Sequence, residues 1–314
     1  LLGPEMLGSE RRTRTLGLGA TVRAFNDLAV PGLGGIWFGK QLFLATLGVA
    51  VAECLRSAGR RAQNIEVANA VEALACWLAL NSNGWNGDPR LRGATKMRDK
   101  SDLSYATMRK PSFYVTQPMR QATVQPLRAL GFTESSGERF NAFACTQLGH
   151  DFINTVCAEF KPYNRSVLDH LVGWARGIHD NVKSTSTLTK ALTPLEPMSK
   201  LAREFLRERI VQGVGIKESR RRKALAWVEL LWSAPETDVG WDAKPAMLDD
   251  DHWRDLQAGG LFFSARDTAI ALLDQIESQI ANQADQRLSL DSPFPKAVAD
   301  YARALRERAQ AFLD

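Results

Sequence analysis

The longest apolar stretch of the chain, "LGGIWFGKQLFLATLGVAVAE" at residues 33–53, is the feature that most constrains the fold. Its apolar side chains cover most of a helical circumference, which predicts a central helix over Ile36–Ser57. Lys40 and Gln41 interrupt the stretch, so we expect a buried helix and not a membrane span. A second apolar helix over Ile65–Leu80 ends in a cluster of turn residues, which favours an antiparallel helix pair.

Most of the remaining chain also has helical periodicity. Further helices are predicted over Arg165–Ile178, Pro197–Gln212, Lys217–Trp232, 264–283 and 296–313. The last two are expected to form a helical hairpin or a coil that binds a partner. The content of 45% hydrophobic and 24% charged residues is typical of a globular protein, so the predicted class is mainly α-helical.

One segment, "GFTESSGERFNAFACTQLGHDF" at 131–152, departs from the helical pattern. It predicts a strand over Phe132–Glu134, a tight turn, and a return strand over Arg139–Cys145. Thr146 is expected to cap the helix that follows. The hairpin is either a wing beside a DNA-reading helix or a hairpin that covers the end of a helix.

Two short helices, Thr116–Ala122 and Thr123–Leu130, are predicted just before this hairpin. Proline removes a backbone donor, so Pro126 has to lie near the first turn of the second helix. Gly131 is expected to end that helix. A helix, a short turn and a second helix form a helix-turn-helix arrangement.

With "LRALGF" before the hairpin and "CTQLG" after it, residues 101–158 resemble a winged helix-turn-helix of the MarR/PadR-like kind. The resemblance covers about a fifth of the chain. It implies a multi-helix protein with a central winged helix-turn-helix that bears one β-hairpin, and a non-enzymatic function in binding duplex DNA. Pro126 departs from the pattern and shortens the reading helix, which favours contact with the DNA backbone over base reading.

The resemblance also implies which residues meet DNA. Arginine and glutamine can bond to base edges, whereas threonine, serine, arginine and lysine can hold phosphate. The predicted nucleic-acid-binding residues on the helices, on the wing and upstream of them are Arg109, Lys110, Arg120, Gln121, Thr123, Gln125, Arg128, Ser136 and Arg139. Lys96, Arg98 and Lys100 are expected to widen the phosphate footprint.

The uneven charge distribution fits a polyanion-binding face. Residues 89–128 hold nine Lys and Arg against two Asp, and residues 196–223 hold nine against four Glu. Residues 236–255 reverse the sign, with seven acidic residues and two basic ones. The formal net charge is +5, and solvated helix faces would explain these runs as well.

The sequence predicts neither a metal site nor a cofactor. Cys54, Cys76, Cys145 and Cys157 lack the close spacing of zinc-ligand pairs and are expected to be buried free thiols in a reducing compartment. Phosphate-binding and nucleophile-elbow glycine motifs are absent. Asp249–His252 could hold Mg²⁺ in a nuclease, but the acidic start of a helix explains the run as well. An enzyme is therefore not the first expectation.

The predicted organisation comprises four regions: a helical region at 1–95, the winged-helix module at 96–160, a helical region at 161–235, and an acidic loop with a helical hairpin at 236–314. An apolar signal core is missing after the paired arginines at 11–12, so a cytoplasmic protein without membrane attachment is expected. The alternative function is a helical adaptor subunit of a larger bacterial complex, such as phage-defence or mobile-element machinery. The winged helix would then serve protein contacts, and the C-terminal helices would bind a protein partner or a second copy.

Overall fold

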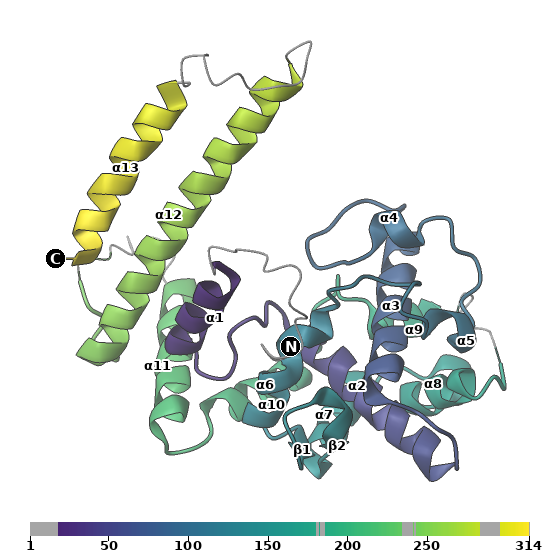
Figure 1. The fold of residues 1–314 in the computed structure, drawn as a ribbon. Coiled ribbons are helices and arrows are strands. Elements are labelled where there is room, and N and C mark those ends of the chain that lie inside the picture. Colours follow the sequence, from purple (N-terminus) through teal and green to yellow (C-terminus); the bar gives the residue numbers. More distant parts are fainter. Residues whose placement is uncertain are drawn as a thin grey trace. The chain divides into compact units, whose positions relative to one another are not determined.

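The computed structural model describes residues 18–179, 182, 186–233, 241, 243–282 and 296–313. The chain forms two compact units: one is Pro31–Arg222, and the other joins Leu1–Val30 to Lys223–Asp314. As predicted, the protein is mainly helical and carries one two-stranded antiparallel hairpin (Figure 1). Residues 96–160 lie in one compact unit with most of both flanking regions.

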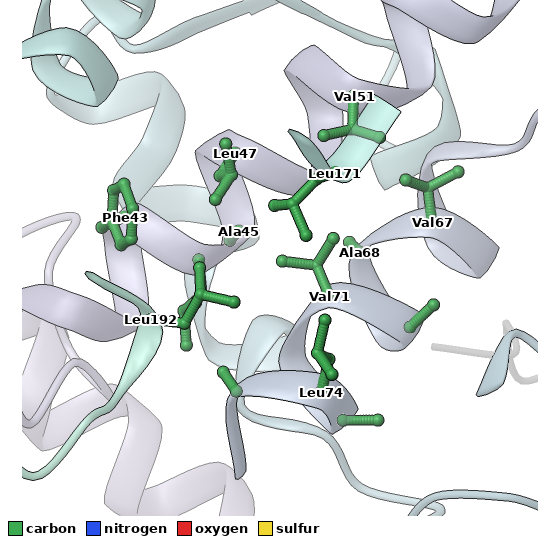
Figure 2. Packing of buried hydrophobic residues seen from close by; sticks show 14 of the residues in the cluster. Phe43, Ala45, Leu47, Val51, Val67, Ala68, Val71, Leu74, Leu171 and Leu192 are labelled. Carbon is green, nitrogen blue, oxygen red and sulfur yellow. The ribbon is translucent and has the colours of Figure 1, made fainter. Parts of the chain in front are cut away.

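Helices α2 (Gly39–Ser57) and α3 (Asn64–Ser82) form the centre of the first unit. Both predicted helices are therefore confirmed, with the same end at Ser57 and other ends that differ by one to three residues. Figure 2 shows Leu47 and Val51 of α2 in one cluster with Val71 of α3 and Leu171 of α8 (Val167–Ala175). Each fully buried side chain of this size contributes about 1.5–3 kcal/mol to folding, so this pair is the main source of hydrophobic stability in the unit.

A glycine sets how closely the two helices approach each other. A Cβ atom placed on Gly48 would lie 2.5 Å from the Cα atom of Ala68 and 2.6 Å from its Cβ atom. Real Cβ atoms essentially never come so close to backbone. The α2–α3 crossing therefore requires glycine at this position and a small residue opposite it.

The helix expected at Thr116 starts later, and that prediction was wrong in its bounds. A 3-10 helix, η2 (Met119–Thr123), is followed directly by α6 (Val124–Ala129). The reason is a distant carboxylate: Glu72, buried on α3, accepts hydrogen bonds from the backbone N–H groups of Met119 at 2.7 Å and Arg120 at 3.0 Å. Glu72 thus provides the N-terminal cap of η2.

The predicted hairpin is confirmed, but its strands are short. Strand β1 (Thr133–Ser135) pairs with β2 (Phe143–Cys145) in the register Thr133↔Cys145. The first part of the expected return strand is instead a 3-10 turn, η3 (Phe140–Ala142). Thr146 caps α7 (Gln147–Cys157) as predicted, because its hydroxyl accepts a hydrogen bond from the Gly149 N–H group at 3.1 Å.

The hairpin packs against the central helices. The side-chain amide of Asn64, the first residue of α3, donates to the carbonyl oxygens of Phe140 at 3.0 Å and Phe143 at 2.8 Å. Glu53 of α2 accepts the Cys145 N–H group at 2.7 Å. The hairpin therefore covers the start of α3, which is one of the two roles that the sequence left open.

The other helices of this unit surround the pair. They are α4 (Ala94–Met97), α5 (Tyr105–Met108), η4 (Pro162–Asn164), α8, α9 (Ser186–Leu192), α10 (Lys200–Val211) and the first part of α11 (Ile216–Ser233). The buried indole of Trp174 on α8 donates to the carbonyl oxygen of Leu103 at 2.8 Å and joins α8 to the segment before α5.

The second unit contains α1 (Leu18–Ala29), the end of α11, α12 (Asp250–Ala281) and α13 (Lys296–Leu313). Phe25 of α1 stacks on Phe262 of α12 at 5.1 Å between ring centroids.

The predicted helix start at Ser264 was wrong, because α12 begins at Asp250 and continues through Ser264. Helices α12 and α13 lie side by side, as the predicted helical hairpin requires (Figure 1). Within the described residues, no helix is both long enough and apolar enough to span a membrane.

We predict that Gly48→Ala lowers the free energy of unfolding by about 1–3 kcal/mol because of overpacking against Ala68. An exposed helical Gly→Ala change normally stabilises a helix by about 1 kcal/mol, so a loss would identify the close approach as its cause. Chemical denaturation of both proteins measures the change. Gly87→Ala is the control, since a Cβ atom there meets no atom within 4 Å. An equally stable Gly48→Ala variant would contradict the prediction.

Candidate anion-binding site

An arginine-lined groove lies on the surface of the Pro31–Arg222 unit. It consists of two adjoining hollows, with volumes of ≈ 320 and ≈ 690 Å³. The turn between α2 and α3, helix α5 and the end of α8 form its walls. The arginines that line it, which we call the groove arginines, are Arg56, Arg60, Arg61, Arg109 and Arg176.

Helix ends bring these arginines together. Gly59 takes the left-handed conformation, φ 74°, and ends α2, so Arg60 and Arg61 lie in the turn that follows. Arg109 and Arg176 are the residues that directly follow α5 and α8. Cations are favoured at such positions because the last carbonyl groups of a helix carry partial negative charge.

The groove keeps a positive charge after its internal pairings. Among its described lining residues, Glu66 is the one carboxylate, so five guanidinium groups leave a net charge of +4. The ends of α2 and α8 offset about half a charge each, which does not change the sign. The Arg109–Glu66 pair is 3.5 Å long and solvent-exposed, so it restrains Arg109 weakly. The groove can therefore hold an anion with several negative charges.

Three of the groove arginines, Arg60, Arg61 and Arg176, have no competing side-chain partner among the described residues. Arg56 supports the turn itself, because its guanidinium donates to the carbonyl oxygen of Ala62 at 3.1 Å and to Asn64 at 2.8 Å. Arg60 and Arg61 are exposed, and their side chains make no hydrogen bond or ion pair within the described residues. Their charge is available for binding at no cost in internal contacts.

Aromatic residues form the inner wall of the smaller hollow. The ring of Tyr105 meets Trp174 edge-on at 5.4 Å, and Arg109 lies 6.0 Å from the Tyr105 ring centroid. Burial raises the pKa of the Tyr105 phenol. Its hydroxyl group is buried and has no hydrogen-bond partner within the described residues.

A pair of histidines lies behind this wall. His179 lines the smaller hollow and stacks on the buried His170 at 4.4 Å between ring centroids. The ring nitrogens of both are buried without a hydrogen-bond partner in the described part of the chain. Gly173 makes room for them, since a Cβ atom there would lie 2.6 Å from His179 Nε2. Burial, together with the nearby charges of His179 and Arg165, lowers the pKa of His170 to about 4.

The structure places one predicted DNA-binding residue, Arg109, in the groove, with the exposed Lys110 beside it in sequence. Two others are directed into the protein. Arg120 is 9% exposed, and its guanidinium donates to Asn69 at 2.6 Å. Thr123 is fully buried, and its hydroxyl donates to the Arg120 carbonyl oxygen at 2.8 Å. These two side chains stabilise the module and do not present a surface to a ligand.

The remaining predicted residues are exposed: Gln121, Gln125, Arg128, Ser136 and Arg139. Of these, Arg139 has a structural connection to the groove. Asn141, two residues later, donates to the side chain of Gln63 at 3.4 Å, and Gln63 lines the larger hollow. The loop of the hairpin therefore meets the edge of the groove.

Several cations of the basic run at 89–128 bond to the backbone of their own unit. Lys96 donates to the carbonyl oxygen of Tyr114 at 2.6 Å, and Lys100 donates to that of Phe113 at 3.1 Å. Arg98 donates to the carbonyl oxygen of Trp85 at 3.3 Å. These three side chains hold loops in place, which reduces the phosphate footprint expected from the run.

Arg60, Arg61 and Arg176 were missed from the sequence. The signal for the first two was the "GRR" triplet between the two most apolar helices, where a short turn has to be exposed. No local signal connects that turn with Arg109 or Arg176, because the three helix ends are far apart in the chain.

The Asp249–His252 run starts α12, as the acidic-helix interpretation predicts. The Asp249 side chain accepts the His252 N–H group at 2.8 Å and pairs with Lys223 at 3.0 Å. These contacts lower its pKa to about 2, with the backbone hydrogen bond as the larger cause. Lys244 pairs with Asp250, and Arg254 pairs with Asp251 at 3.2 Å. Each carboxylate thus has a cationic partner.

The chain was also compared with known proteins. No protein-family model, curated protein or solved structure matches it. The groove must therefore be interpreted from its own geometry.

We predict that His170 makes the protein less stable in acid. The folded-state pKa, about 4, lies below the ordinary value of 6.5, so the folded state binds fewer protons than the unfolded chain. The stability that depends on neutral His170 is complete above pH 6.5 and is lost as the pH falls towards about 4. Each pKa unit of difference corresponds to about 1.4 kcal/mol. Thermal unfolding from pH 7.5 to 4 should show a smaller loss in His170→Gln. Parallel curves for the two proteins would contradict the assignment.

Proposed function

We propose that the chain binds the phosphate backbone of duplex DNA through the groove arginines and has no catalytic role in doing so. The observation that carries the proposal is the net charge of +4 in a groove where Arg60 and Arg61 have no side-chain partner in the described part of the chain. Guanidinium groups match phosphate oxygens in pairs, and each paired contact releases condensed counterions from the DNA.

The aromatic residues favour backbone contact over the stacking of single-stranded bases. Trp174 is 1% exposed, so its faces are covered by protein. The ring of Tyr105 is occupied on its sides by Trp174 and Arg109. Proteins that hold single strands offer open aromatic faces to successive bases, and the described groove has no such face.

The winged-helix interpretation of residues 101–158 supplies a second contact area. Arg139 and Ser136 lie in the loop of the hairpin, whose Asn141 contacts Gln63 at the edge of the larger hollow. Gln121, Gln125 and Arg128 are exposed on η2 and α6. A helix of six residues that contains Pro126 is short for insertion into a major groove. The wing and the groove arginines would therefore act together on the backbone.

Self-association through the C-terminal helices is a second candidate role, favoured by apolar side chains that are exposed on the last two helices. These side chains are Ile270 at 49%, Leu273 at 57% and Leu305 at 39% exposure. Large aliphatic groups at helical spacing on α12, with one more on α13, fit a coil with a second copy of the chain.

We predict that replacing both Arg60 and Arg61 by Ala weakens binding to a labelled 20-base-pair duplex by at least about tenfold. Each lost charge-assisted hydrogen bond is worth about 1.5–3 kcal/mol. The slope of log affinity against log salt should fall by about 1.8, because two phosphate contacts are lost. Fluorescence anisotropy over a salt series measures both quantities. Arg60→Lys with Arg61→Lys should recover part of the affinity and most of the slope, since lysine keeps the charge but lacks the paired geometry.

The matched control is Lys200→Ala with Arg203→Ala, which removes two exposed positive charges from α10 outside the groove. It should leave binding within about twofold, because single surface charges act weakly at a distance in salt. Equal losses from both double variants would show that the groove is not the binding site. Failure of the unaltered protein to bind any duplex at low salt would overturn the proposed function.

For the second role, we predict that Leu273→Glu shifts the protein towards the monomer in light scattering after size-exclusion chromatography. A buried charge in an apolar coil is strongly unfavourable. Gln275→Glu adds the same charge at an exposed position of α12 and is the control. A monomeric parent protein over the whole concentration range would exclude self-association.

A further inference from the structure

A second cluster of chemically reactive side chains lies where the hairpin meets α2 and α7. A carboxylate oxygen of Glu53, the Cys145 sulfur and a ring nitrogen of His150 all lie within 4.8 Å of one another. The three residues come from different elements: Glu53 from α2, Cys145 from the end of β2, and His150 from the first turn of α7. No sequence pattern indicates this cluster, because Glu53 is far from the other two residues along the chain.

We propose that Glu53, Cys145 and His150 form a zinc-binding site that fastens the hairpin and α7 to α2. One thiolate, one imidazole and one carboxylate belong to the donor types that Zn²⁺ takes. Ca²⁺ and Mg²⁺ require oxygen donors and are disfavoured by the sulfur and nitrogen. Three protein donors leave a fourth tetrahedral position for water.

The surrounding structure holds two of the donors in place. Glu53 accepts the backbone N–H group of Cys145 at 2.7 Å through one oxygen, so the carboxylate is fixed beside the thiol. Donors around tetrahedral zinc lie roughly 3.3–3.8 Å apart, as follows from bond lengths of about 2.0–2.3 Å. Small side-chain rotations within the 4.8 Å limit therefore suffice to reach coordination geometry.

Gly149 keeps the start of α7 close to the thiol. A Cβ atom on Gly149 would lie 2.7 Å from the Cys145 sulfur and 2.3 Å from the carbonyl oxygen of Phe132. Thr146 adds a second restraint, since its hydroxyl bonds both to the Gly149 N–H group and to the Gly131 carbonyl oxygen. His150 follows one residue later on the same helical turn, so its approach to Cys145 is set by backbone geometry.

The Cys145–Glu53 contact would also exist in a site without metal, as a cap on the edge of β2. Such a cap requires Glu53 and the backbone of Cys145. It has no requirement for a thiol at position 145 or for an imidazole at position 150. Zinc binding requires all three side chains, so substitutions at Cys145 and His150 separate the two roles.

The first experiment treats the full-length protein with a chelator, removes the chelator and adds Zn²⁺. The expected result is one zinc per chain in competition with a chromogenic chelator, and a rise in melting temperature of roughly 5 °C at saturating zinc. Co²⁺ in place of zinc should give a thiolate-to-cobalt charge-transfer band and the visible bands of a tetrahedral site. A melting temperature that zinc does not raise, or a cobalt spectrum without the charge-transfer band, would overturn the proposal.

The second experiment compares variants that retain shape. Cys145→Ser and His150→Gln should each weaken zinc binding by at least about tenfold, as expected when a metal site loses a ligand or its support. Cys157→Ser, which alters a thiol on the same helix as His150, is the matched control and should bind zinc like the parent. Circular dichroism without zinc checks that each variant is folded. Equal zinc affinity in Cys145→Ser and Cys157→Ser would exclude Cys145 as a ligand. The site is independent of DNA binding, and a failure of either proposal leaves the other standing.

Discussion

The rest of the structure depends on the close packing of α2 against α3, which Gly48 permits by admitting the backbone of Ala68. Because both helices are buried on nearly every side, they have almost no solvent-facing stripe on which a polar residue could be hydrated. Any polar side chain on them must find its partner inside the protein, since an unpaired buried polar group costs about 1–3 kcal/mol. The polar side chains of α2 and α3 therefore form hydrogen bonds to the segments that surround the two helices.

The partners are backbone groups of the irregular segments. Lys40 donates to the carbonyl oxygen of Ala191 on α9, and Gln41 donates to that of Met119. Glu72 caps η2, and Asn64 holds the turn of the hairpin. Burial lowers the pKa of Lys40 to about 8, because desolvation disfavours the charged ammonium group. Its hydrogen bond to the Ala191 carbonyl oxygen gives this buried group a polar partner. Polar residues that interrupt two apolar helices thus decide where short segments dock.

The same pair positions both candidate sites. The last turn of α2 supplies Glu53 to the proposed zinc site and Arg56 to the groove, three residues apart. The turn after it supplies Arg60 and Arg61. Hairpin attachment and anion binding therefore share one structural support, the end of α2.

The sequence by itself determined the helical class, the central helix pair, the hairpin and the Thr146 cap, because each depends on local periodicity or on contacts within a few residues. The sequence also indicated that the chain is basic, but it did not show which Lys and Arg side chains are available to bind a ligand. The tertiary structure decided that Arg120 and Thr123 are buried. It also placed the carboxylate of Glu72 where it caps the start of η2. It brought Arg60, Arg109 and Arg176 into one groove. The physical reason is that hydrogen bonds and charges act through space, and only the folded chain brings distant residues within their range.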